Sequence, residues 1–75
     1  MQYKYLIIDT GEVIGGIAFS PVWQHKHIAK ALGGTVTGAG FLRVADGKVI
    51  CEGASDSLRI AAQADDAVHF SYLVK

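Results

Sequence analysis

The chain has 75 residues, a formal net charge of zero and 51% hydrophobic residues, with nine glycines, one proline and one cysteine. It is too hydrophobic for a disordered segment and short enough for a single domain over residues 1–75. The zero charge argues against a nucleic-acid or anionic-membrane binder, and a single cysteine closes no internal disulfide.

The apolar runs are far shorter than a membrane span. Leu6-Ile7-Ile8 is typical of them, whereas a transmembrane helix needs about 20 residues. The start Met1-Gln2-Tyr3-Lys4 also lacks the apolar stretch of a signal peptide. We therefore expect no membrane association and a cytoplasmic location.

Two strands are predicted first. Residues 3–9 are rich in β-forming types, and residues 12–19 are predicted to return as a second strand after a turn at Thr10-Gly11. Gly15-Gly16 indicates a bulge or a close backbone approach within the second strand.

A helix is predicted next. Ser20 is a preferred N-cap residue and Pro21 suits the first helical position, so the helix is expected to run to Leu32 and to stop at Gly33-Gly34. Helical periodicity puts His25 on the apolar face, so His25 is the histidine expected to point inward. The residues of that face are Val22, His25, Ile28, Ala29 and Leu32.

The segment 35–52 is predicted to be a β-hairpin. Asp46-Gly47 suits a type I′ turn and fixes the register, with Val44 opposite Val49 and Phe41 opposite Glu52. We expect a core face and an opposite face that carries Phe41 and Ile50. The core-face residues are Leu42, Val44, Val49 and Cys51.

The last third is predicted to hold a short extended segment around Leu58 and Ile60 and a final helix that Asp65 or Asp66 caps. The apolar face of that helix consists of Ala67, Phe70, Leu73 and Val74. The order β-β-α-β-β-(short β)-α predicts a small α+β domain, with two helices packed on one face of an antiparallel or mixed sheet.

His25 is the candidate for chemistry. Near the start of a helix, where backbone N–H groups favour an anion, a neutral imidazole can attack a phosphoryl group or act as a general base. The alternative is an ordinary inward histidine that bonds to a strand carbonyl. His25 and His27 point away from each other on a helix, so no metal site is expected. Cys51 is expected to be an unreactive core residue.

The chain resembles the Janus-type phosphohistidine phosphatases. The segments that carry this resemblance are Tyr3-Lys4-Tyr5-Leu6-Ile7, Trp23 with His25 and Ile28, Gly38-Ala39-Gly40, and Val49-Ile50-Cys51-Glu52-Gly53-Ala54-Ser55. The resemblance implies a small α+β fold, a catalytic histidine at His25 and a phosphate-binding loop at Gly53, Ala54 and Ser55.

Association is the function that the sequence favours first. If two helices cover one face of the sheet, apolar residues on the other face need a partner, and a small domain often gains burial by oligomerising. The interface is expected to include Tyr3, Tyr5, Phe41 and Ile50. We therefore expect a non-catalytic module without a cofactor that forms a homo-oligomer, with a dimer as the first expectation and another protein as a further candidate partner. A metal-independent phosphohydrolase that uses His25 is the alternative.

Overall fold

The structure is a computed structural model that describes residues 2–74. Its elements follow the order β1 (Gln2–Asp9), β2 (Ile14–Phe19), α1 (His25–Leu32), β3 (Thr35–Ala45), β4 (Lys48–Glu52), β5 (Ala54–Ser55), β6 (Ile60–Ala61) and the 3₁₀ helix η1 (Asp66–Val74). Within this range, no helix is long and apolar enough to cross a membrane.

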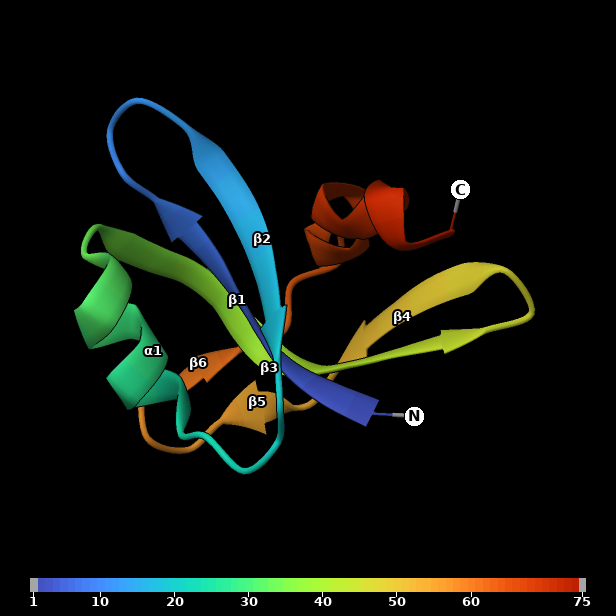
Figure 1. Cartoon of the computed structure of the whole chain (residues 1–75), viewed down its shortest axis with the longest axis horizontal. Coiled ribbons are helices and arrows are strands. Elements are labelled where there is room, and N and C mark those ends of the chain that lie inside the picture. Colours follow the sequence, from blue (N-terminus) through green and yellow to red (C-terminus); the bar gives the residue numbers. More distant parts are fainter. Residues whose placement is uncertain (1, 75) are drawn as a thin grey trace.

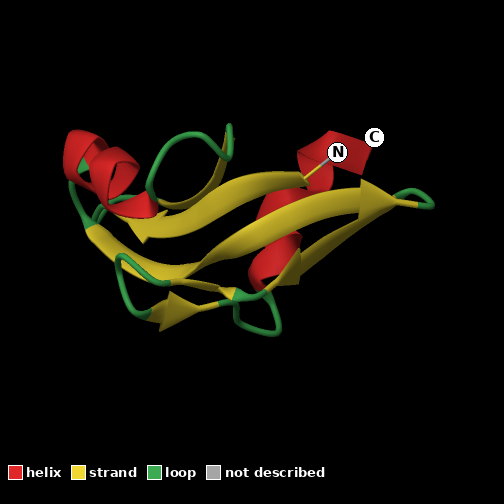
Figure 2. Cartoon of the chain, turned by 90° about the horizontal axis from the view of Figure 1, so that it is seen from below, coloured by secondary structure: helices red, strands yellow, loops and turns green. Residues whose placement is uncertain are grey.

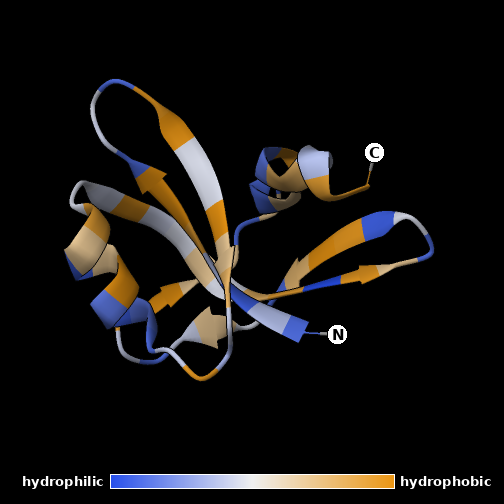
Figure 3. Ribbon diagram, viewed as in Figure 1, coloured by the Kyte–Doolittle hydropathy of each residue, from blue (hydrophilic) through white to orange (hydrophobic). Residues whose placement is uncertain are grey.

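The main sheet has the strand order β2-β1-β3-β4, and all its neighbouring strands are antiparallel (Figure 1). A second, two-stranded sheet pairs β5 with β6. The α+β class is therefore confirmed, with an antiparallel main sheet. Hydrophobic residues occur in all four strands of the main sheet and in α1, whereas the tips of both long hairpins are hydrophilic (Figure 3).

The β3–β4 hairpin has the predicted register. Phe41 lies opposite Glu52 and Val44 opposite Val49, and the turn residues Asp46 and Gly47 have φ values of 52° and 71°. Positive φ at both positions is the requirement of a type I′ turn, which the Asp-Gly pair satisfies. Along the expected core face, Leu42 is buried and Val49 and Cys51 pack against the core, whereas Val44 is 41% exposed near the tip.

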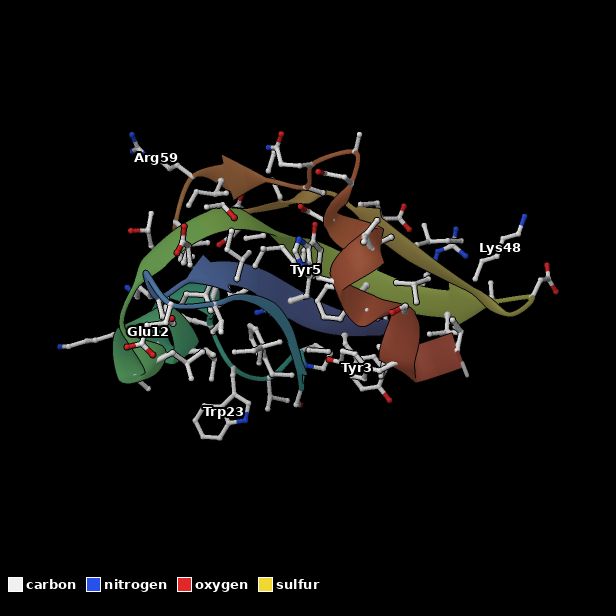
Figure 4. All side chains as sticks on the ribbon, turned by 90° about the horizontal axis from the view of Figure 1, so that it is seen from above. Tyr3, Tyr5, Glu12, Trp23, Lys48 and Arg59 are labelled. Atoms are coloured by element: carbon white, nitrogen blue, oxygen red, sulfur yellow. The ribbon has the colours of Figure 1, made fainter. Side chains whose placement is uncertain are left out.

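Strand β1 lies inside the sheet and is apolar on both faces. Tyr5 and Ile7 form a buried cluster with Phe70 of η1, and Leu6 and Ile8 are buried on the opposite face. One face of the sheet therefore packs against η1. Seen from above, η1 crosses in front of the strands (Figure 4), and seen from below it passes behind them (Figure 2).

Helix α1 belongs to the other face. The His25 ring lies edge-on to Phe19 and Phe41, with centroid distances of 5.5 and 6.1 Å. Both aromatic residues pair with Lys4, which is on the Leu6 side of β1. The expectation that both helices pack on one face is therefore wrong: each face carries one helix, because each face of β1 presents apolar side chains that need cover.

The start of α1 also differs from the prediction. Ser20 and Pro21 form a separate turn, in which the Trp23 amide donates to the Ser20 carbonyl at 3.1 Å. The helix begins at His25, after Gln24 in an extended conformation. A Ser-Pro pair suits the first position of a turn as well as of a helix, since Pro fixes φ in both. Val22 is consequently exposed and does not belong to the inward face.

The C-terminal helix is a 3₁₀ helix with a kink at Phe70, where φ is −119°. Phe70 is buried, but Leu73 and Val74, expected on the same face, are exposed. The kink interrupts the helix at Phe70, so Leu73 and Val74 do not continue the face that buries Phe70.

A buried hydrogen bond fixes η1 to the sheet. The Tyr5 hydroxyl donates to Asp66 Oδ2 at 2.5 Å, and the Gln63 amide donates to the same oxygen at 2.8 Å. Gly38 makes room for this carboxylate, because a Cβ at that position would lie 2.5 Å from Asp66 Oδ2. Burial, together with Asp66, raises the pKa of Tyr5, so the phenol stays a neutral donor. Tyr5 lies in the core and presents no surface to a partner.

We predict that Tyr5→Phe lowers the free energy of unfolding by about 1–3 kcal/mol, because the buried Asp66 carboxylate loses a donor. Tyr72→Phe is the matched control, since its hydroxyl makes an exposed bond of 3.3 Å to the Gly16 carbonyl. The control should change stability by less than about 0.5 kcal/mol. Urea denaturation of the two variants measures the difference, and equal losses would contradict the role of the buried bond.

Candidate functional site

The candidate site is a pocket on the α1 face, where the start of α1 meets β1 and the loop that follows β5. Its volume is about 340 Å³. The lining residues are Lys4, Gln24, His25, Lys26, Phe41, Ala54, Asp56 and Ser57. His25 and Ala54, which the resemblance assigns to catalysis and to phosphate binding, thus line one pocket although 29 positions separate them in the sequence.

His25 is held by one ring nitrogen. Its side chain is only 3% exposed, and Nε2 lies 2.9 Å from the Gly40 carbonyl oxygen. A carbonyl oxygen only accepts, so Nε2 carries the proton and donates it. Phe19 and Phe41 contact the ring from the sides. The imidazole is therefore fixed in orientation and in tautomer.

The other ring nitrogen, Nδ1, is free to act. Among residues 2–74, Nδ1 has no hydrogen-bond partner, yet no fully buried side-chain nitrogen or oxygen of these residues lacks one. Nδ1 therefore keeps some contact with solvent although the residue is only 3% exposed, and His25 is one of the residues that line the pocket. In the Nε2–H tautomer this nitrogen has a lone pair that can accept a proton or a phosphoryl group.

Burial lowers the pKa of His25 below its ordinary value of 6.5. The hydrogen bond to Gly40 acts in the opposite direction, and the positive charge of Lys4 lowers the pKa further. Since the lowering effect is the larger, His25 is neutral at pH 7 and its Nδ1 is unprotonated.

Two lysines supply positive charge to the pocket. The Lys4 ammonium donates to the Trp23 carbonyl at 2.9 Å and so joins β1 to the segment before α1. Lys26 lies in the first turn of α1, and its amide donates to Ser57 Oγ at 3.3 Å. Asp56 is the acidic residue of the lining, so the formal charge of the lining residues, with His25 neutral, is +1.

Ser55 holds the loop that follows β5 and does not line the pocket. Ser55 is buried, and its Oγ accepts from the Leu58 amide at 3.2 Å and lies 3.3 Å from Ser57 Oγ. Gly53, with a φ of 77°, follows β4, and a Cβ at this position would lie 3.1 Å from the Phe41 ring. Of the three residues that the resemblance assigns to phosphate binding, Ala54 lines the pocket, Ser55 holds the loop and Gly53 lies outside the lining.

Four residues used in this site are not among those predicted from the sequence: Lys4, Lys26, Asp56 and Ser57. A signal for Lys4 is present in the sequence: it is the charged residue on the strand face that carries Leu6 and Ile8. Asp56 and Ser57 follow the loop that the resemblance identifies, but no local pattern separates them from ordinary turn residues.

The residues expected at an interface do not form one exposed surface. Tyr3 packs against the buried cluster that contains Tyr5. Phe41 packs against the His25 ring, whereas Ile50 is half-buried on an edge strand. Tyr3 lines a separate hollow of mostly apolar residues. The other residues of that hollow are Ala18, Phe19, Ser20, Val44, Tyr72 and Leu73.

Other chemistry has less support. Burial raises the pKa of the Cys51 thiol, which disfavours the reactive thiolate. In the described part of the chain, no group of three or more His, Cys, Asp or Glu residues could hold a metal ion.

Comparison of the chain with protein-family models, curated proteins and solved structures gives no match.

We predict that ¹⁵N NMR finds the His25 ring as the Nε2–H tautomer at pH 7, with a titration midpoint below 6.5. The physical reasons are the bond to Gly40 and the burial of the ring. His25→Gln identifies the resonance by its disappearance. A ring that is protonated at pH 7, or that carries its proton on Nδ1, would contradict this geometry.

Proposed function

We propose that the pocket beside His25 binds phosphoryl groups and that the chain is a metal-independent phosphohydrolase acting on phosphorus–nitrogen bonds in the cytoplasm. The observation that carries the proposal is the state of His25. One ring nitrogen is fixed by Gly40, the other has no partner among residues 2–74, and His25 lines a pocket together with two lysines. The resemblance to the phosphohistidine phosphatases supports the same assignment.

The charge and the volume of the pocket both suit a phosphoryl group. A pocket of about 340 Å³ accommodates a phosphoryl group together with part of the group that carries it. Lys4 and Lys26 attract the phosphoryl oxygens, and Asp56 belongs to the same lining. Because Asp56 repels an anion, we expect the phosphoryl group to bind toward the two lysines, with Asp56 nearer the leaving nitrogen, which is cationic in a protonated phosphoramidate.

His25 acts in this proposal as a general base. Nδ1 removes a proton from a water molecule, and the water oxygen forms the new bond to phosphorus. The phosphorus–nitrogen bond breaks, and its electron pair stays on the leaving nitrogen. That nitrogen is already protonated in the reactive form of a phosphoramidate, so it departs as a neutral amine. The proton on Nδ1 then returns to solvent, and inorganic phosphate leaves the pocket.

Association remains a second proposal, but the surface that supports it differs from the one expected from the sequence. The expected reason was an apolar face without cover, but each face of the main sheet carries a helix. Tyr5 and Phe41 are occupied by contacts within the chain. The edge strand β4, which includes Ile50, is one surface that stays available for association.

We predict that the wild-type chain releases phosphate from phosphoramidate and that His25→Ala lowers the rate by about 10²–10⁴-fold, the usual contribution of a general base. The rate should rise with pH through the His25 pKa, which lies below 6.5, and level off near neutrality, because only the unprotonated Nδ1 accepts a proton. A colorimetric phosphate assay between pH 5 and 8 measures both effects.

His27→Ala is the matched control, since His27 is exposed on the same helix and should leave the rate unchanged. Lys4→Met keeps the aliphatic stem and removes the charge, so it should raise KM for the anionic substrate. A wild-type chain that releases no phosphate would contradict the proposal, and so would a His25→Ala variant as active as the wild type.

A further inference from the structure

Strand β4 forms an open edge of the main sheet. It is the last strand in the order β2-β1-β3-β4, and the end of the β3–β4 hairpin, with Lys48, projects away from the rest of the chain (Figure 4). Helix η1 packs against both edge strands. At β2 its Tyr72 hydroxyl donates to the Gly16 carbonyl, whereas Val49 and Cys51 of β4 pack against the buried cluster around Phe70. An open edge strand presents unpaired backbone groups to another strand.

The hairpin register determines which backbone groups of β4 point outward. The two-residue turn makes Ala45 and Lys48 a hydrogen-bonded pair, and such pairs alternate along an antiparallel ladder. Ile50 therefore bonds to Arg43 of β3, whereas the N–H and C=O groups of Val49 and Cys51 point away from β3. Among residues 2–74, no hydrogen bond reaches these outward groups.

We propose that two copies of the chain dimerise by antiparallel pairing of β4 with β4, on a two-fold axis at Ile50. In this register Val49 of each copy lies opposite Cys51 of the other, and the two pairs exchange four backbone hydrogen bonds. Ile50 lies opposite its own counterpart as a non-bonded pair, in which side chains are closest. The result is one continuous sheet of eight strands.

The side chains of β4 favour a second copy as the occupant of this edge. The strand reads Lys-Val-Ile-Cys-Glu, so antiparallel pairing about Ile50 puts Lys48 of one copy opposite Glu52 of the other, twice. Glu52 already accepts from Arg43 Nε at 2.9 Å, so each carboxylate would lie between two cations. A two-fold interface usually risks placing like charges together, and this strand avoids that because its two charges are opposite and equidistant from the axis.

The open part of the edge ends at Gly53. There the Ala62 amide donates to the Gly53 carbonyl at 3.0 Å, and β6 takes the place of a further strand beside β5. Pairing is therefore limited to residues 48–52, a short interface for which we expect a dissociation constant of about 10 μM to 1 mM. The phosphoryl pocket lies outside this segment, so dimerisation and hydrolysis can be tested independently.

Amide hydrogen exchange tests the register directly. It is followed by NMR at protein concentrations below and above the expected dissociation constant. We expect the Val49 and Cys51 amides to become protected as concentration rises, since they point outward in the monomer. The Ile50 amide, bonded to β3, should be protected at every concentration. At the same concentrations, sedimentation equilibrium should show the mass rising from that of the 8.0 kDa chain to that of a dimer.

Charge-swap variants separate this register from other modes of association. Lys48→Glu and Glu52→Lys each place like charges opposite one another and should weaken the dimer at least about tenfold, whereas the double variant should restore it. Val68→Lys, at an exposed position of η1, is the control and should dimerise as the wild type does. Circular dichroism verifies that each variant is folded.

Three results would overturn the proposal. One is a monomer at all concentrations, which would leave the edge to a different protein. Another is a dimer in which the Val49 and Cys51 amides still exchange freely. The third is a folded double charge-swap variant that dimerises no better than the two single variants.

Discussion

The hydrogen bond from His25 Nε2 to the Gly40 carbonyl is the contact on which the proposed chemistry depends. It joins the first residue of α1 to the middle of β3 and fixes the tautomer of the ring. The same bond leaves Nδ1 as the available nitrogen, while burial keeps the ring neutral. If this bond were absent, the ring could rotate or exchange its proton between nitrogens, and the pocket would have no oriented base.

This bond depends in turn on β1, because each face of the strand packs against a different helix. Its apolar residues alternate on two faces, and Tyr5 with Asp66 holds η1 on one of them. Helix α1 is thereby left to cover the opposite face, where His25 reaches Gly40 beside Lys4. Strand β4 is an edge of the main sheet, so the association that we propose there and the catalysis that we propose at His25 involve different parts of the molecule.

Much of the local structure could be predicted from the sequence. The Asp46-Gly47 turn determines the register of its hairpin through backbone conformation alone, and that register is confirmed. The inward position of His25 is also confirmed, although the helix begins five positions after Ser20. A Ser-Pro pair does not distinguish the start of a helix from an isolated turn, because both use the same φ.

The placement of the helices and the composition of the pocket were harder to predict, because they depend on contacts distant in sequence. The buried role of Asp66 requires knowing that Tyr5 lies beneath it, 61 positions away. The strand face of Lys4 could be predicted from the alternation along β1, but its place beside Ser57 depends on a loop turn that no local pattern encodes. Alternation along β1 did indicate two apolar faces, and it favours one helix on each face over two helices on one.

The most direct test of the account is a titration of the ¹⁵N-labelled chain with inorganic phosphate, followed at the side chain of His25. If the pocket binds phosphate beside Nδ1, the Nδ1 resonance and the amide of Lys26 should shift together and saturate with one dissociation constant. His69, on η1 at the opposite face, should not shift with them. A titration in which His25 stays unchanged while other residues respond would contradict the assignment of this pocket as the phosphoryl site.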